Sequence, residues 1–274
     1  MKFLKLIGFI LLIIFLTVLT QVGGVILLLC YPLFILIKRR FHKKALRRLL
    51  FFGSYSVIYL LVTFFIIPPI AKNFGSVPLP ISDTIKPLNI MTCILNRHYV
   101  KPKLKTNIKN VSTKINQKYP NTIISYLDAN FPFYNGFPLL PHLSHSDGKK
   151  VDIAFFYKDK TGKEINNDAP SFIGYGVFEA PKKNEYNMPN NCKNKGFWQY
   201  SILGKVVPQW NKNKIIFDQK RTKYLIQLLT QESTTSKILI EPHLKTRMNL
   251  NSNKIRFHGC RAVRHDDHIH LQIK

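Results

Sequence analysis

Two long apolar runs dominate the beginning of the chain. Residues 3–37 are apolar with few interruptions, and Leu49 to Ala71 forms a second run. A membrane-spanning helix needs about 20 apolar residues. The first run is longer than one span and shorter than two, so we expect one long helix that is tilted or kinked. The second run predicts another helix, which ends at the helix-breaking pair Pro68-Pro69. The first twenty residues also resemble a signal peptide, but the apolar pattern resumes after Gly24, which disfavours cleavage.

The segment between the apolar runs predicts the orientation of the chain in a membrane. Residues 38–48, KRRFHKKALRR, contain seven Lys or Arg residues. Short loops this rich in positive charge stay in the cytoplasm. Two crossings then place both the N-terminus and residues 72–274 outside the cytoplasm. A buried hairpin in a soluble core is the alternative, but a run of 23 residues without a charge disfavours it. We therefore predict a membrane anchor at 1–71.

The remainder of the chain has the pattern of an α+β domain. Residues 72–90 are rich in Pro, Gly and Ser and predict a linker, which leaves 91–274 as the outer domain. One helix is expected at 218–231, with Asp218 as its N-cap. Strand-like patterns occur at 151–157, 214–217, 238–240 and 268–273. Strands with few intervening helices predict a compact α+β domain with a mainly antiparallel sheet.

Charge alone does not select a function. The chain has 41 Lys and Arg against 14 Asp and Glu, a formal net charge of +27. Such a balance is typical of proteins that bind nucleic acid or a membrane surface. A nucleic-acid role would require the basic domain to face the cytoplasm, against the prediction from residues 38–48. We therefore expect no nucleic-acid partner and no obligate protein partner. A basic outer domain would be attracted to an anionic cell wall, although a solvated, Lys-rich surface explains the charge equally well.

Four cysteines are too few for a disulfide scaffold and lack the spacing of a structural zinc site. Cys30 falls in the first apolar run, where a small buried hydrophobe is expected. Cys93, Cys192 and Cys260 fall in the outer domain. Two of them could form a bridge, and the spacing does not indicate which two.

Histidines and aspartates cluster at two places in the outer domain. The first cluster, HLSHSDGKKVD, begins at His142 and contains His145 and Asp152; the second, HDDHIH, runs from His265 to His270. Residues i and i+2 of a strand share a face, so His268 and His270 point the same way. A turn at Asp147-Gly148 can bring His145 back to Asp152.

These side chains form a ligand set with a known chemistry. Two imidazoles and one carboxylate are a common protein contribution to a catalytic zinc site, whose fourth position holds water. We therefore predict Zn²⁺ bound by His145, Asp152 and His270. Such a site also needs a proton shuttle beside the metal, and His268 is placed for that role. We interpret the isolated histidines as surface or core residues: His42, His98, His243 and His258.

The two motifs resemble those of the penicillin-insensitive murein endopeptidases, within the lysostaphin, D-alanyl-D-alanine-peptidase and hedgehog-like zinc folds. HLSHSDGKKVDI is similar to the HxSHxxGxDxDI pattern, and HDDHIH to HDDHxH. The resemblance implies the same three zinc ligands and His268 as the catalytic auxiliary. It adds His142 and His265 as active-site residues that contact the substrate, the transition state or a second metal. The motifs cover under a tenth of the chain, and Lys149-Lys150 departs from the first pattern.

The resemblance implies a zinc-dependent peptidase whose partner is peptidoglycan. The expected reaction is hydrolysis of its cross-linking or stem peptides by a domain outside the cytoplasmic membrane. Two alternatives remain open. One is a membrane-anchored wall-binding or regulatory protein without turnover. The other is a zinc peptidase that acts on proteins or on D-amino-acid dipeptides. The bond that is cut is not determined by the motifs.

Overall fold

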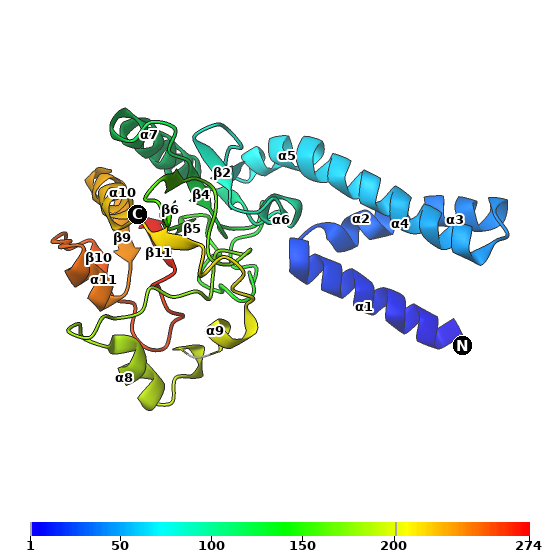
Figure 1. Cartoon of the computed structure of the whole chain (residues 1–274). Helices are drawn as coiled ribbons and strands as arrows, with labels where there is room; N and C mark the ends of the chain where they lie inside the picture. The colour runs from blue at the N-terminus through cyan, green and yellow to red at the C-terminus, as the bar shows by residue number, and fades with distance from the viewer. Residues whose placement is uncertain (1, 201) are drawn as a thin grey trace.

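The computed structural model describes residues 2–200 and 202–274, which form an apolar helical region and an α+β domain (Figure 1). The helical region consists of α1 (Lys2–Thr20), α2 (Gly23–Leu29), α3 (Tyr31–Arg40), α4 (Lys44–Leu61), a π-helical turn (Val62–Ile66) and α5 (Ile67–Asn73). Two stretches, Phe3–Thr20 and Lys44–Asn73, are long and apolar enough to cross a membrane. The prediction of two apolar helices near the N-terminus is thereby confirmed.

The first apolar run is not the single long helix that its length predicts, because the chain turns back after α1. Gln21 adopts a left-handed φ of 68°, and the Thr20 hydroxyl accepts a hydrogen bond from the Gly23 N–H at 2.8 Å. A side chain at Gly24 would collide with the carbonyl oxygen of Ile13, so glycine allows α2 to pack closely on α1. The N-terminus and the α3–α4 turn consequently lie at the same end, far from the α+β domain (Figure 1).

The second apolar helix continues past Pro68-Pro69, so the predicted end at these prolines is wrong. The π-helical turn is followed by α5, whose first turn contains both prolines and which ends at Asn73. The π-helical turn directly before the prolines interrupts the regular i→i−4 hydrogen bonding of the helix, so residues without an N–H are accommodated there.

The centre of the α+β domain is a six-stranded mixed sheet with the order β10–β9–β11–β5–β4–β2. Its strands are β2 (Ile85–Pro87), β4 (Ile124–Tyr126), β5 (Lys150–Ala154), β9 (Thr235–Leu239), β10 (Ile255–Arg256) and β11 (His268–Ile273). The inner pairings are antiparallel, whereas β10–β9 and β4–β2 are parallel. The predicted α+β class is confirmed, and the sheet is mixed, with a parallel pair at each edge.

Smaller elements surround this sheet. Two minor sheets consist of β1 (Val77–Pro78) with β3 (Tyr99–Val100), and of β7 (Glu164–Ile165), β6 (Tyr157–Asp159) and β8 (Ile215–Phe217). The helices are α6 (Met91–Ile94), α7 (Pro102–Lys118), α8 (Met188–Asn194), a 3₁₀ turn (Trp198–Tyr200), α9 (Leu203–Val206), α10 (Gln219–Gln231) and α11 (Pro242–Arg247). The expected linker at 72–90 contributes β1 and also β2, the edge strand of the central sheet.

The central strands separate an apolar face from a polar one. Alternate residues of β5 and β11 belong to the same core as α7 and α10: Val151, Ile153, Ile269 and Leu271. The residues between them point to the opposite face because side chains alternate along a strand. In the antiparallel register of the two strands, His270 lies opposite Asp152. This pairing places residues 118 positions apart in direct contact.

One buried ionic group joins α10 to the β6–β7 hairpin. Asp218 is the predicted N-cap, and its carboxylate accepts the backbone N–H of Arg221. The fully buried Arg221 guanidinium donates to that carboxylate at 2.8 Å. It also donates to the carbonyl oxygens of Tyr157 and Ile165, at 2.7 and 3.0 Å. Arg221 therefore holds three segments together through charge-assisted hydrogen bonds.

We predict that Arg221→Ala lowers the free energy of unfolding by about 3 kcal/mol or more, because it leaves the buried Asp218 carboxylate without its guanidinium partner. Denaturant unfolding of the purified full-length chain in detergent measures the change. The exposed Gln227 of the same helix is the control, and Gln227→Ala should change stability by about 0.5 kcal/mol at most. Equal effects of the two substitutions would contradict the structural role of Arg221.

Candidate metal centre

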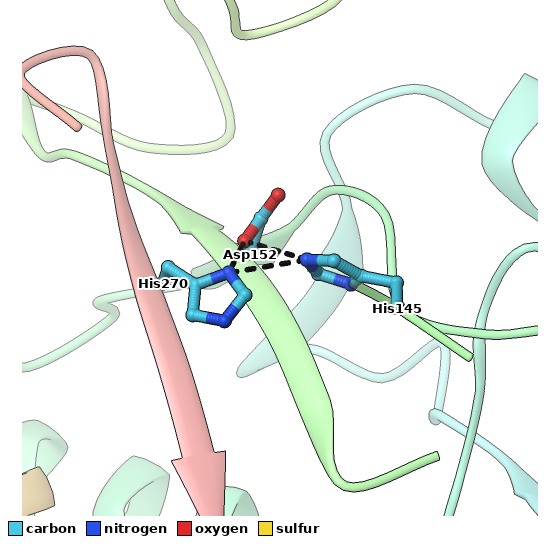
Figure 2. Close-up of side chains that lie close together, drawn as sticks. All are labelled: His145, Asp152 and His270. Carbon is cyan, nitrogen blue, oxygen red and sulfur yellow. Dashed lines mark hydrogen bonds and ion pairs between the residues drawn. The ribbon is translucent and has the colours of Figure 1, made fainter. Parts of the chain in front are cut away.

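The three predicted ligand side chains meet in a buried group on the polar face of the central sheet (Figure 2). Asp152 projects from β5 and His270 from β11, whereas His145 reaches them from the loop before β5. Nε2 of His145 lies 3.1 Å from Nδ1 of His270 and 3.2 Å from Oδ1 of Asp152. Nδ1 of His270 lies 2.8 Å from the same carboxylate oxygen. These three donor atoms could hold one metal ion.

The spacing of the donor atoms fits an ion bound among them. Zinc binds histidine nitrogen and carboxylate oxygen at about 2.0–2.2 Å, so tetrahedral donors lie roughly 3.3–3.6 Å apart. The observed separations are slightly shorter, and a small outward movement of the side chains would accommodate the ion. Each of the three residues is at most 4% exposed, which would shield the ion from bulk water.

Hydrogen bonds and charge prepare the donor atoms for a metal. Nδ1 of His145 lies 2.9 Å from the carbonyl oxygen of Ala129, which can only accept, so Nδ1 donates the hydrogen and Nε2 faces the other two donor atoms. Burial lowers the pKa of His270 to about 4 despite the opposing effect of Asp152, which keeps the imidazole neutral. Burial would raise the pKa of Asp152, but the charges of His145 and His268 hold it well below its usual range.

Tyr175 positions the second oxygen of the Asp152 carboxylate. Its hydroxyl donates to Oδ2 of Asp152 at 2.9 Å and accepts the backbone N–H of Asp128 at 3.2 Å. Burial, followed by the charges of Asp152 and Asp128, raises the pKa of Tyr175 well above its usual value. The phenol therefore remains a hydrogen-bond donor that directs Oδ1 toward the two histidines.

His268 lies beside the ligand group without belonging to it. Nδ1 of His268 is hydrogen-bonded to the carboxylate of Asp267, and Nε2 lies 3.7 Å from Oδ2 of Asp152. Within residues 2–200 and 202–274, the buried Nε2 atom has no hydrogen-bond partner. Burial alone would lower the pKa of His268, but Asp152 and Asp267 raise it to about 9. This environment suits a histidine that carries a proton at Nε2.

His142 lies at the edge of the same group and interacts with a second carboxylate. Its Nδ1 atom is 2.9 Å from Oδ2 of Asp128 and 3.7 Å from Oδ2 of Asp152. Arg97 contacts the same Asp128 oxygen at 2.8 Å. Burial would raise the pKa of Asp128, but the hydrogen bond from His142 and the charge of Arg97 lower it. His142 is therefore near the three ligands but is turned toward Asp128.

His265 is the third predicted auxiliary histidine that the structure places at the centre. Its ring centroid lies 5.0 Å from that of His268 and 5.6 Å from that of His270. Burial, followed by the neighbouring imidazoles of His268 and His270, holds the pKa of His265 well below its usual value. A neutral imidazole here can donate one hydrogen bond into the site.

The candidate metal centre lies in a cleft of about 420 Å³, and His145, Asp152 and His270 are among the residues that line it. Its walls include residues outside the predicted set: Trp198, Gln199, His258, Arg261 and Val263.

The disulfide is Cys192–Cys260, which joins α8 to the loop that carries His258 and Arg261. Cys93 is a buried free thiol. The bridge thus connects the loop of one cleft wall to α8, across a sequence separation of 68 residues.

Sequence patterns missed the residues that orient the predicted ones. Asp267 directly precedes His268 in the HDDHIH motif, so the motif could have indicated that Asp267 orients His268. Asp128 and Tyr175 lie outside both motifs, and nothing in their local sequence marks them. His258, interpreted as an isolated residue, lies in the cleft wall with its ring centroid 5.9 Å from that of His265.

Comparison with known proteins finds no family model that matches the chain and no match among curated proteins.

We predict that Tyr175→Phe weakens zinc binding roughly 10- to 100-fold, the usual effect of removing a hydrogen bond to a metal-ligating carboxylate. Competition for zinc between the purified protein and a chromogenic chelator measures the affinity. Tyr134 is exposed, so Tyr134→Phe is the matched control and should bind zinc as the unaltered chain does. Unchanged affinity in Tyr175→Phe would show that this hydroxyl does not orient Asp152 for the metal.

Proposed function

We propose that the protein is a membrane-anchored zinc peptidase that hydrolyses peptide bonds of peptidoglycan. The observation that carries this proposal is the buried group of His145, Asp152 and His270. Two imidazoles and one carboxylate in the lining of an open cleft are characteristic of catalytic zinc sites, which retain one position for water or substrate. A zinc ion bound there would lower the pKa of its water toward neutrality and polarise the scissile carbonyl.

Proton transfer, stabilisation of the transition state and substrate binding are assigned to other residues of the site. His268 carries a proton at Nε2 and would donate it to the leaving amine; the neutral imidazole would then take a proton from the next water molecule that enters the site. Asp267 fixes the orientation of the ring. His265 donates a hydrogen bond to the oxygen that becomes negative in the transition state. His142 and Asp128 lie at the edge of the group, where they bind the substrate backbone.

The resemblance of the two motifs to murein endopeptidases indicates the substrate class. Ligands on neighbouring antiparallel strands, with a further ligand from the preceding loop, also support a fold of the lysostaphin and hedgehog-like type. Stem peptides of peptidoglycan carry free carboxylates, and Arg261 in the cleft wall offers them a cation. The basic surface of the domain would hold it against an anionic wall.

The helical region is proposed to span the cytoplasmic membrane with the α+β domain outside. The basic residues of 38–48 lie at the end of the helices farthest from the domain, which the positive-inside rule places in the cytoplasm (Figure 1). Because α1 and the α2–α3 segment form a hairpin, Lys5 lies at that same end. We therefore place the N-terminus in the cytoplasm, in contrast to the outside location expected from a single first helix.

Digestion of purified sacculi by the full-length protein tests the enzymatic proposal. We expect released muropeptides by mass spectrometry, and their loss on addition of a chelator. His270→Ala should lose both bound zinc and cleavage. His268→Ala should retain zinc while cleavage falls roughly 10²- to 10⁴-fold, because only proton transfer is removed.

His42 lies in the exposed turn before α4, so His42→Ala is the matched control and should retain both properties. Zinc binding without cleavage of any muropeptide would favour the wall-binding or regulatory alternative. Cleavage of proteins or D-amino-acid dipeptides but not of sacculi would favour the other peptidase. Unchanged cleavage by His270→Ala would overturn the proposed metal centre.

Single-cysteine reporters test the topology. We expect Phe3→Cys and His42→Cys to react with a membrane-impermeant maleimide only after the cells are permeabilised, and Tyr134→Cys to react in intact spheroplasts. The buried free thiols Cys30 and Cys93 are changed to serine in this background. Labelling of Phe3→Cys from outside would support the two-crossing topology instead. Labelling of His42→Cys from outside would contradict the proposed orientation.

A further inference from the structure

The helical region contains a groove that the peptidase chemistry does not use. It lies between α1, α3 and α4 and has a volume of about 720 Å³, within the range of roughly 300–1,000 Å³ that is usual for ligand sites. Its walls are mainly apolar and include Phe9, Leu12, Leu27, Phe34, Phe51 and Tyr55. We call this space the helix groove.

Three basic side chains, one from each helix, gather along the helix groove. Lys5 belongs to the first turns of α1, Lys38 to the last turn of α3 and Arg48 to the beginning of α4. All three are exposed, and none forms an ion pair with any residue in the described parts of the chain. Residues 1–71 contain no Asp or Glu, so no nearby carboxylate of this region can neutralise them.

Membrane insertion makes an empty groove unfavourable. Helices in a bilayer are surrounded by lipid chains, and a space between them that is lined by apolar side chains fills with the same chains. The basic end would lie at the cytoplasmic surface, where anionic headgroups are concentrated. An acyl chain and a phosphate on one molecule therefore match the two chemically distinct parts of the groove.

We propose that the helix groove binds one anionic glycerophospholipid of the cytoplasmic leaflet. Its phosphodiester is bound by Lys5, Lys38 and Arg48, and an acyl chain lies between α1 and the α3–α4 pair. The bound lipid would connect α1 to the other helices at the end where α1 stands apart from them (Figure 1). This inference rests on the proposed membrane insertion and is independent of the metal centre.

Native mass spectrometry of the full-length protein, released from nanodiscs of phosphatidylglycerol and phosphatidylcholine, tests the proposal. We expect a retained phosphatidylglycerol adduct and no equivalent phosphatidylcholine adduct. The triple variant Lys5→Ala, Lys38→Ala and Arg48→Ala should weaken phosphatidylglycerol binding roughly 100-fold, since each basic residue near the surface contributes about a factor of five.

The control removes three charges from the same basic region but outside the groove: Arg39→Ala, Arg40→Ala and Arg47→Ala. This variant should retain the adduct, because these residues do not line the helix groove. Leu12→Trp fills the apolar part while leaving the three cations in place, and it should also lose the adduct.

Several outcomes would overturn the site. These are equal retention of the two lipids, equal loss in both triple variants, and an unaffected adduct in Leu12→Trp. Carbonate extraction of the same variants reports membrane insertion separately, and zinc content reports the metal centre. An unaltered protein that is inserted and binds zinc but does not distinguish the two lipids contradicts the lipid site alone.

Discussion

The antiparallel pairing of β11 with β5 is the constraint on which the site depends. Its register sets His270 opposite Asp152, while Ile269 and Ile153 enter the core on the other face. A shift by one residue would exchange these faces, burying polar side chains in the core and exposing apolar ones. The free energy of the hydrophobic core thus fixes the positions of two metal-ligand candidates. His145 depends on a different contact, its hydrogen bond to the Ala129 carbonyl.

A dense group of histidines and carboxylates is buried on the polar face of the sheet. Hydrogen bonds and ion pairs, rather than apolar packing, stabilise these polar groups. Each carboxylate has at least one charged or hydrogen-bonding partner: Asp152 has Tyr175, Asp128 has Arg97, and Asp267 has His268. Buried charges are tolerated when they are paired in this way. The consequence is a set of candidate donor atoms that are held close together, and only small side-chain movements would adapt them to an ion.

The helical region is packed against the domain that carries the site. Tyr59 of α4 donates a hydrogen bond to the carbonyl oxygen of Ile94, and the Gln21 side chain accepts the backbone N–H of Phe133. Phe133 lies at the start of the loop that continues to His142 and His145. The proposed membrane anchor therefore does more than tether the domain, because it fixes one end of the loop that supplies part of the candidate centre.

The sequence by itself determined the features that depend on local pattern. Apolar runs marked the helical region, the basic segment 38–48 separated its two parts, and two short motifs identified His145, Asp152 and His270 because strand periodicity puts alternate residues on one face. Only the tertiary structure decided what depends on contacts between distant segments. These contacts turned the first apolar run into a hairpin, made residues 72–90 part of the sheet, joined Cys192 to Cys260 and brought Tyr175 to Asp152. Local sequence does not encode these contacts, because each arises from the packing of chain segments that are far apart.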